Sequence, residues 1–154
     1  MTNANLQDQG QFDENTATII ISFLSHLKKP VCILAHNGKS FDFPILKSEF
    51  EKLNIPLPSD VYIVDTLLGF RKFGMPELPL NQKLHKDVKF KLNGNISYAL
   101  QNLHLYFFGK QHVASHSSEG DCIALAKVCH KVRDRIVPWI EENCFKFDTV
   151  LPLW

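Results

Sequence analysis

Two short stretches of the sequence place acids beside turn residues or a histidine. In residues 35–44, Asp42 follows a sharp turn, and residues 116–121 begin with His116 and end with Asp121. Carboxylate oxygens from two such acids suit Mg²⁺ or Mn²⁺. A histidine that titrates near neutrality can take a proton from a water molecule. Acids, divalent ions and a histidine together favour phosphodiester hydrolysis by a two-metal scheme.

The same residues also suit a purely structural role. Asp42 falls in the first turn of an expected helix, where the helix dipole stabilises a negative charge. Parallel α/β sheets bind ligands at the carboxyl ends of their strands, and two acids that converge there need a cation between them. His116 and Asp121 could equally be a capping histidine and a helix-start acid. Spacing alone leaves both interpretations open.

The elements that would position these residues alternate between strands and helices. Apolar runs predict strands at 31–35 and 61–64, and Ser97 is expected to cap a helix. Helical periodicity predicts helices at 13–28, about 39–53, 65–73, 97–109, 117–132 and 138–144. This order predicts an α/β fold with a parallel sheet and helices on its faces. The apolar residues expected to face the core include Ile19, Phe23 and Ile123.

Length and composition predict a loose N-terminus at residues 1–12 and a single domain at 13–154. Hydrophobic residues make up 45% and charged residues 21%, which is typical of a globular protein. The four cysteines are widely spaced, so they indicate reduced core residues of an intracellular protein, in the nucleus or cytoplasm, rather than a zinc site. No apolar run approaches the ~18–20 residues that span a bilayer, so no membrane partner is expected.

Residues 74–95 differ from the rest of the chain because glycine, proline and asparagine interrupt any periodicity. Four lysines, here called the basic segment, gather in this stretch: Lys83, Lys86, Lys89 and Lys91. A solvated surface loop is one interpretation. The other is a flexible basic arm that contacts the phosphates of a nucleic acid.

Residues 32–44 and 116–121 resemble the second and third motifs of the three-prime repair exonucleases, the TREX family of DEDDh 3′-5′ exonucleases. The similarity extends to residues 13–27, 64–65 and 98–100, and to the tail near Trp139. The resemblance implies a ribonuclease H-like fold. It also implies hydrolysis of phosphodiester bonds at DNA 3′ ends, with single strands preferred, and two Mg²⁺ or Mn²⁺ ions.

Carried over by position, the resemblance makes Asp42 and Asp121 metal ligands and His116 the general base. The residues that would bind nucleic acid, besides the basic segment, are His36, Asn37, Lys39, Ser40 and Tyr98. One departure is Ser40, because the family usually has a basic residue two places before the motif-two aspartate.

A larger departure is the family's first motif, an Asp-x-Glu pair on an N-terminal strand, which residues 1–30 do not contain. Asp13 and Glu14 open a helix, where adjacent side chains point apart, so they cannot replace it. We therefore expect an incomplete sheet without its N-terminal strands, an exposed edge at residues 31–35 and impaired catalysis. A homodimer through an edge strand would cover that edge. The alternative function is a catalytically inactive module that binds nucleic acid or protein.

Overall fold

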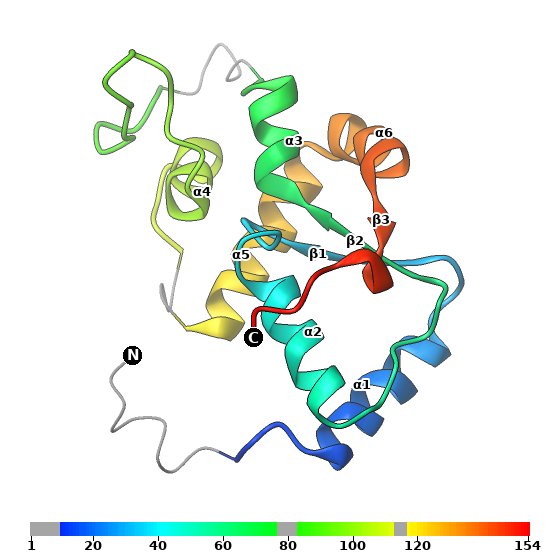
Figure 1. Ribbon diagram of the computed structural model, residues 1–154. Helices are drawn as coiled ribbons and strands as arrows, with labels where there is room; N and C mark the ends of the chain where they lie inside the picture. The colour runs from blue at the N-terminus through cyan, green and yellow to red at the C-terminus, as the bar shows by residue number, and fades with distance from the viewer. Residues whose placement is uncertain (1–9, 77–82, 113–116) are drawn as a thin grey trace.

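The computed structural model describes residues 10–76, 83–112 and 117–154. Most of the predicted loose N-terminus, part of the 74–95 loop and His116 lie outside these described residues. The elements, shown in Figure 1, are α1 (Glu14–His26), β1 (Val31–Ala35), α2 (Asp42–Lys52), β2 (Val61–Asp65), α3 (Thr66–Phe73), α4 (Leu100–Phe108), α5 (Ser118–Lys131), α6 (Arg133–Asn143), β3 (Phe145–Lys146) and the 3₁₀ turn η2 (Phe147–Thr149).

Within the described residues, the sheet has three strands in the order β1-β2-β3. β1 and β2 are parallel and in register from Val31 beside Val61 to Ala35 beside Asp65. The prediction of a parallel sheet is correct for this pair and wrong for β3, which runs antiparallel to β2. β3 has only two residues, too few to carry a strand pattern in the sequence. β1 lies at the edge of the sheet, as expected.

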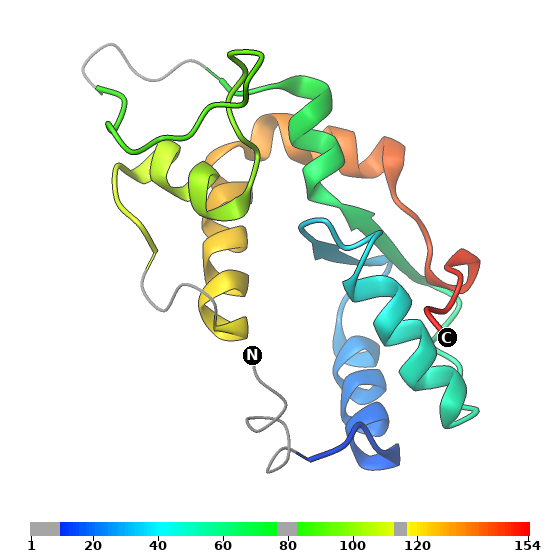
Figure 2. The ribbon, with the colours of Figure 1, turned by 60° about the vertical axis from the view of Figure 1, so that its left-hand side comes forward.

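Three groups of buried side chains hold the helices in place. α1 packs on the sheet through Leu24 against Val31 and Val61, and α2 packs through Phe43 against Ile63. The third group joins α3, α4, α5 and α6, and consists of Phe70, Leu103, Phe107, Val128, Val132 and Ile136. Figure 2 shows α4 and α5 set apart from α1 and α2. The core is therefore divided between the sheet and a helical cluster.

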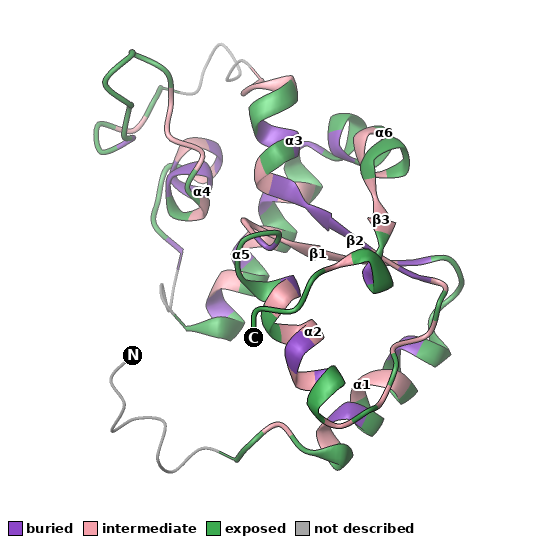
Figure 3. Cartoon of the chain, in the orientation of Figure 1, coloured by how far each residue is buried: buried purple, intermediate pink, exposed green. Residues whose placement is uncertain are grey.

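Several residues expected in the core are exposed. Ile19 is 68% exposed, Phe23 64% and Ile123 47%, and Cys122 is also at the surface, so these predictions are wrong. On α1, Leu24 of the same predicted face is buried, together with Ala17, and α5 buries Ala124 and Val128 instead. Figure 3 shows the exposed faces of α1 and α5 in green. Periodicity identified the helices, but it did not show which of two adjacent apolar stripes would face the protein.

Three helix starts differ from the prediction. α2 begins at Asp42 rather than near residue 39, because the preceding residues form two tight turns. α4 begins at Leu100, and Ser97 does not cap it, because the backbone of Ser97 pairs with Lys89. α6 begins at Arg133, so Pro138 lies inside this helix and does not open it.

Candidate nucleic-acid-processing site

The loop between β1 and α2 makes a sharp turn that only small or turn-forming residues allow. Asn37 has a φ of +68°, in the left-handed region that asparagine tolerates. A Cβ at Gly38 would collide with the side chain of Ala35 and come within 2.9 Å of the Phe43 ring. The turn ends at Asp42, which opens α2 with its side chain exposed. The prediction of a sharp strand exit here is confirmed.

Asp65, at the end of β2, fixes this loop through hydrogen bonds to its backbone. Its carboxylate is buried, with the residue only 3% exposed. It accepts hydrogen bonds from the backbone N–H groups of Asn37 at 2.8 Å, Leu67 at 3.0 Å and Lys39 at 3.2 Å. The bond from Leu67 caps α3, and the bonds from Asn37 and Lys39 reach the loop, which no sequence pattern indicated. Asp65 therefore links the end of β2 to the loop, and both of its carboxylate oxygens accept hydrogen bonds from the backbone.

His36 ties the same loop to a distant part of the chain. Its Nδ1 lies 3.0 Å from the Thr66 hydroxyl, and its Nε2 lies 2.7 Å from the carbonyl oxygen of Tyr98. The contact with a carbonyl requires a proton on Nε2. Burial lowers the pKa of His36, which favours the neutral ring. Both ring nitrogens are thus used within the protein, and His36 connects the loop to Tyr98.

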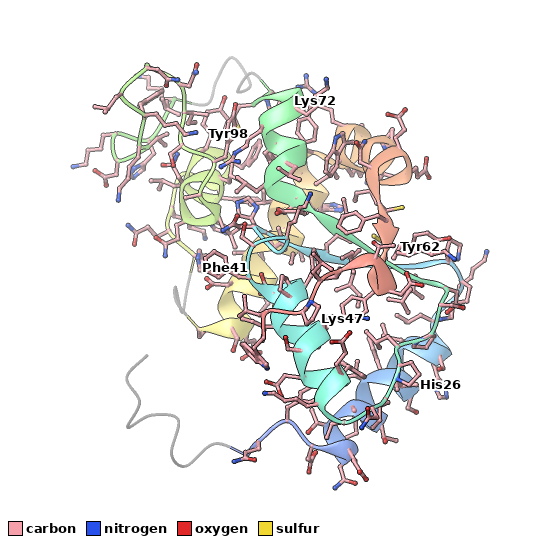
Figure 4. All side chains as sticks on the ribbon, in the orientation of Figure 1. His26, Phe41, Lys47, Tyr62, Lys72 and Tyr98 are labelled. Carbon is pink, nitrogen blue, oxygen red and sulfur yellow. The ribbon has the colours of Figure 1, made fainter. Side chains whose placement is uncertain are left out.

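A pocket lies between this loop and the residues that precede α4. His36, Asn37, Tyr98 and Lys91, all predicted to bind nucleic acid, line it together with Arg71 from the last turn of α3. The Lys91 ammonium lies 5.8 Å from the centre of the Tyr98 ring. Figure 4 shows Tyr98 beside α4. The pocket thus offers two cations, an aromatic ring and an amide, which suit the phosphate and the base of a nucleotide. Arg71 was not identified from the sequence.

The basic segment is more ordered than predicted. Residues 89–97, here called the lysine hairpin, form two short arms joined by an antiparallel bridge between Phe90 and Ile96. The buried side chain of Asn102 forms hydrogen bonds to both ends of the lysine hairpin. Asn102 accepts from the N–H of Lys89 at 2.6 Å and donates to the carbonyls of Lys89 at 3.0 Å and Ser97 at 2.7 Å. All four lysines of the basic segment are exposed, and so are Lys39 and Ser40 on the loop before α2.

Asp121 lies in the first turn of α5, as predicted. Ser117 caps the helix by accepting from the N–H of Gly120 at 3.1 Å, and the Asp121 N–H donates to the Ser117 carbonyl at 2.9 Å. The side chain of Asp121 is 42% exposed, and its Oδ1 lies 3.3 Å from Nε2 of the buried His112. The sequence gave no sign of this contact, because a lone histidine in a loop carries no pattern.

The described residues do not by themselves make a metal centre. Asp42 and Asp121 offer the hard oxygens that Mg²⁺ and Mn²⁺ prefer. However, among residues 10–76, 83–112 and 117–154, no group of three or more histidine, cysteine, aspartate or glutamate side chains could hold an ion. Asp42 and Asp121 lie in the first turns of two different helices, α2 and α5. These first turns are apart in Figure 2. The proposed ligands therefore fit the metal in chemical type but not in number.

The basic pocket thus adjoins the loop that leads to Asp42, whereas Asp121 lies on another helix. Comparison with known proteins shows that the chain is similar over most of its length to three-prime repair exonucleases 1 and 2 and to Exonuclease DPD1. No protein-family model matches the chain.

Each of the individual relatives is named as an exonuclease. The chain is 27% identical over 144 residues to Three-prime repair exonuclease 1 of Homo sapiens, which covers 93% of this chain and 43% of that protein. It is 29% identical over 143 residues to Three prime repair exonuclease 2 of Homo sapiens, covering 93% of this chain and 57% of that protein. Exonuclease DPD1 of Arabidopsis thaliana is 28% identical over 122 residues, which are 77% of this chain and 34% of that protein. The chain thus spans about half the length of the relatives it matches.

No helix in the described part of the chain is long and apolar enough to cross a membrane.

Proposed function

We propose that this chain carries part of a 3′-5′ exonuclease site that acts on DNA 3′ ends. The homology to the three-prime repair exonucleases, which extends over 93% of the chain, is the observation that carries this proposal. The structure supports it with two solvent-accessible acids, Asp42 and Asp121, each in the first turn of a helix. A basic pocket beside the Asp42 loop offers a place for the nucleic acid.

The proposed roles follow from these positions. Asp42 and Asp121 would bind divalent ions, which neutralise phosphate charge when bound, and His116 would be the general base. The pocket residues and the basic segment would bind the phosphates and bases. Because residues 1–30 contain no Asp-x-Glu pair, we expect catalysis by this chain alone to be weak or absent.

The alternative function is a module that binds DNA ends without cutting them. The pocket at Arg71, Lys91 and Tyr98 favours this alternative, because it needs no metal ion. The buried clasp of Asn102 likewise holds the lysine hairpin without help from either acid. Binding and cleavage can therefore be separated in this chain.

The test measures both properties on the purified chain. Fluorescence anisotropy with a labelled DNA reports binding, and gel analysis of a 3′-labelled oligonucleotide with Mg²⁺ or Mn²⁺ reports trimming. We expect binding with little or no trimming. Trimming that disappears in both D42N and D121N would show that the site is complete and would contradict the expected impairment. A chain that neither binds nor trims DNA would refute the exonuclease proposal and the alternative together.

A further inference from the structure

A pocket of about 630 Å³ opens between the end of α4 and the first part of α5. Its apolar wall comes from Phe108 on α4 and from Ile123 and Ala124 on α5. Ile123 is 47% exposed, so this part of the wall is open to solvent. The volume lies within the roughly 300–1,000 Å³ of small-molecule sites and exceeds what an inorganic ion fills. The pocket therefore has room for an organic ligand.

Two buried histidines add their rings to the lining of this pocket. His104 is 3% exposed and His112 is 8% exposed. The centre of the His104 ring lies 4.6 Å from that of the Phe108 ring and 5.5 Å from that of the His112 ring. A hydrogen bond of 3.0 Å between Nδ1 of His104 and the carbonyl oxygen of Lys110 fixes the central ring. Three rings in contact, held by the protein itself, suit a planar aromatic group in the ligand.

The charged side chains that line the pocket are mainly positive. Lys110, in the loop after α4, and Lys127, on α5, stand against one acid, Glu119, and all three residues are exposed. Burial is the main reason why the pKa of His104 is lowered, and the positive charges of Lys127 and Lys110 act in the same direction. Both ammonium groups are therefore close enough to act on the same buried ring. An anionic group bound here would gain charge-assisted hydrogen bonds from both lysines.

We propose that this pocket binds a nucleoside 5′-monophosphate, with the phosphate between Lys110 and Lys127 and the base against Phe108. The two cations and the ring cluster lie in one pocket and match the two parts of such a ligand. The inference goes beyond the proposed function and does not rest on it, because it needs neither a DNA end nor a metal ion. Nε2 of His112 also lies 3.3 Å from Oδ1 of Asp121, so the ligand would be one side chain away from the candidate site.

The test is isothermal titration calorimetry of the purified chain with deoxyadenosine monophosphate. EDTA is present, so that no divalent ion can join the phosphate to Asp42 or Asp121. Inorganic phosphate and deoxyadenosine are titrated separately. Because the pocket offers partners to both parts of the nucleotide, we expect each part alone to bind about tenfold more weakly or worse.

Three variants locate the binding. The double variant K110Q/K127Q removes both cations, and I123W narrows the pocket from an exposed position without changing its charge. K131Q is the matched control, since Lys131 is exposed on the same helix and lies outside the pocket lining. We expect K110Q/K127Q and I123W each to weaken nucleotide binding about tenfold, and K131Q to change it by less than about twofold. Urea unfolding checks that each variant is folded.

Each other result has a definite meaning. Equal affinities of K110Q/K127Q and the unchanged chain for the nucleotide would overturn the inference, and so would unchanged binding in I123W. Inorganic phosphate that binds as tightly as the nucleotide would reduce the site to the attraction of an adventitious ion only and would also overturn it. A chain that binds DNA in the anisotropy assay but not the nucleotide would leave the proposed function intact and refute this inference. Pocket-dependent nucleotide binding by a chain that binds no DNA would support this inference and refute the proposed function.

Discussion

Replacement of Asp65 should loosen the loop that carries Asp42, although Asp65 is not a proposed catalytic residue. Its carboxylate accepts three backbone hydrogen bonds, two at Oδ1 from Asn37 and Leu67 and one at Oδ2 from Lys39. D65A removes both acceptor oxygens and with them all three hydrogen bonds. D65N keeps Oδ1 as an acceptor, but it sets an amide NH₂ against the Lys39 N–H.

The magnitude follows from those contacts. Hydrogen bonds to a charged group contribute about 1.5–3 kcal/mol each, and the bond to Lys39 is the longest of the three. We expect D65A to lower the free energy of unfolding by about 4.5 kcal/mol or more, the lower limit for three such bonds. The smaller change in D65N should cost about 1–2 kcal/mol, because only one of the three donors loses its acceptor. A loss of the first size is a large part of the ~5–15 kcal/mol that stabilises a typical domain.

Urea unfolding of D65A, D65N and D60A measures these differences. Asp60 is a suitable control, because it is at the surface and pairs with Lys29 at 3.1 Å in a salt bridge with both side chains partly exposed. Such a pair contributes about 0–1 kcal/mol. DNA affinity, measured where all the variants are folded, should be lower in D65A than in D60A because Asn37 lines the pocket. Equal stabilities of D65A and D60A would refute the reasoning, since the buried hydrogen bonds would then contribute nothing.

Two further predictions concern charge. Changing the four lysines of the basic segment to alanine should weaken DNA binding equally for all sequences and reduce the slope of log K against log[salt] by about 0.7–0.9 for each lost phosphate contact; an unchanged slope in a salt titration would remove these lysines from the interface. Burial lowers the pKa of His36 below its ordinary 6.5 in the folded state. The unfolded chain therefore binds a proton at His36 more readily than the folded chain does, and the free energy of unfolding falls as the pH drops below about 6.5 toward the folded-state pKa. H36Q should therefore show a smaller loss of unfolding free energy between about pH 7 and pH 5 than the unchanged chain, measured by urea unfolding.

Local features of this fold could be read from the sequence because their causes lie within a few residues. Asp13 caps α1 by accepting from the N–H of Thr16 at 2.8 Å, and Asp65 and Ser117 cap α3 and α5 in the same way. Gly109 ends α4 with a φ of +65°, as a glycine after a helix should. Each of these is a signal from one residue to its near neighbours. The acid positions in the candidate site were predictable for this reason.

Contacts between distant segments could not be read in the same way. His36 meets Tyr98 across 62 positions, and Asp65 meets Asn37 across 28. Asn102 looks like an ordinary polar residue of α4 until the structure places the lysine hairpin against it. No periodicity records such pairs, because only the folded chain brings them together. The antiparallel β3 was missed for a related reason, since two residues form a strand only beside an existing one.

The acid-bearing loop and the basic surface are held by one connected set of hydrogen bonds. Asp65 fixes the Asn37 end of the loop, and His36 joins that end to the Tyr98 carbonyl. Tyr98 directly follows the arm of the lysine hairpin that Asn102 clasps. The position of Asp42 relative to the lysine hairpin therefore depends on Asp65, His36 and Asn102, none of which is a proposed metal ligand. The same hydrogen bonds would therefore hold the proposed DNA-binding surface in place whether or not a metal ion is bound.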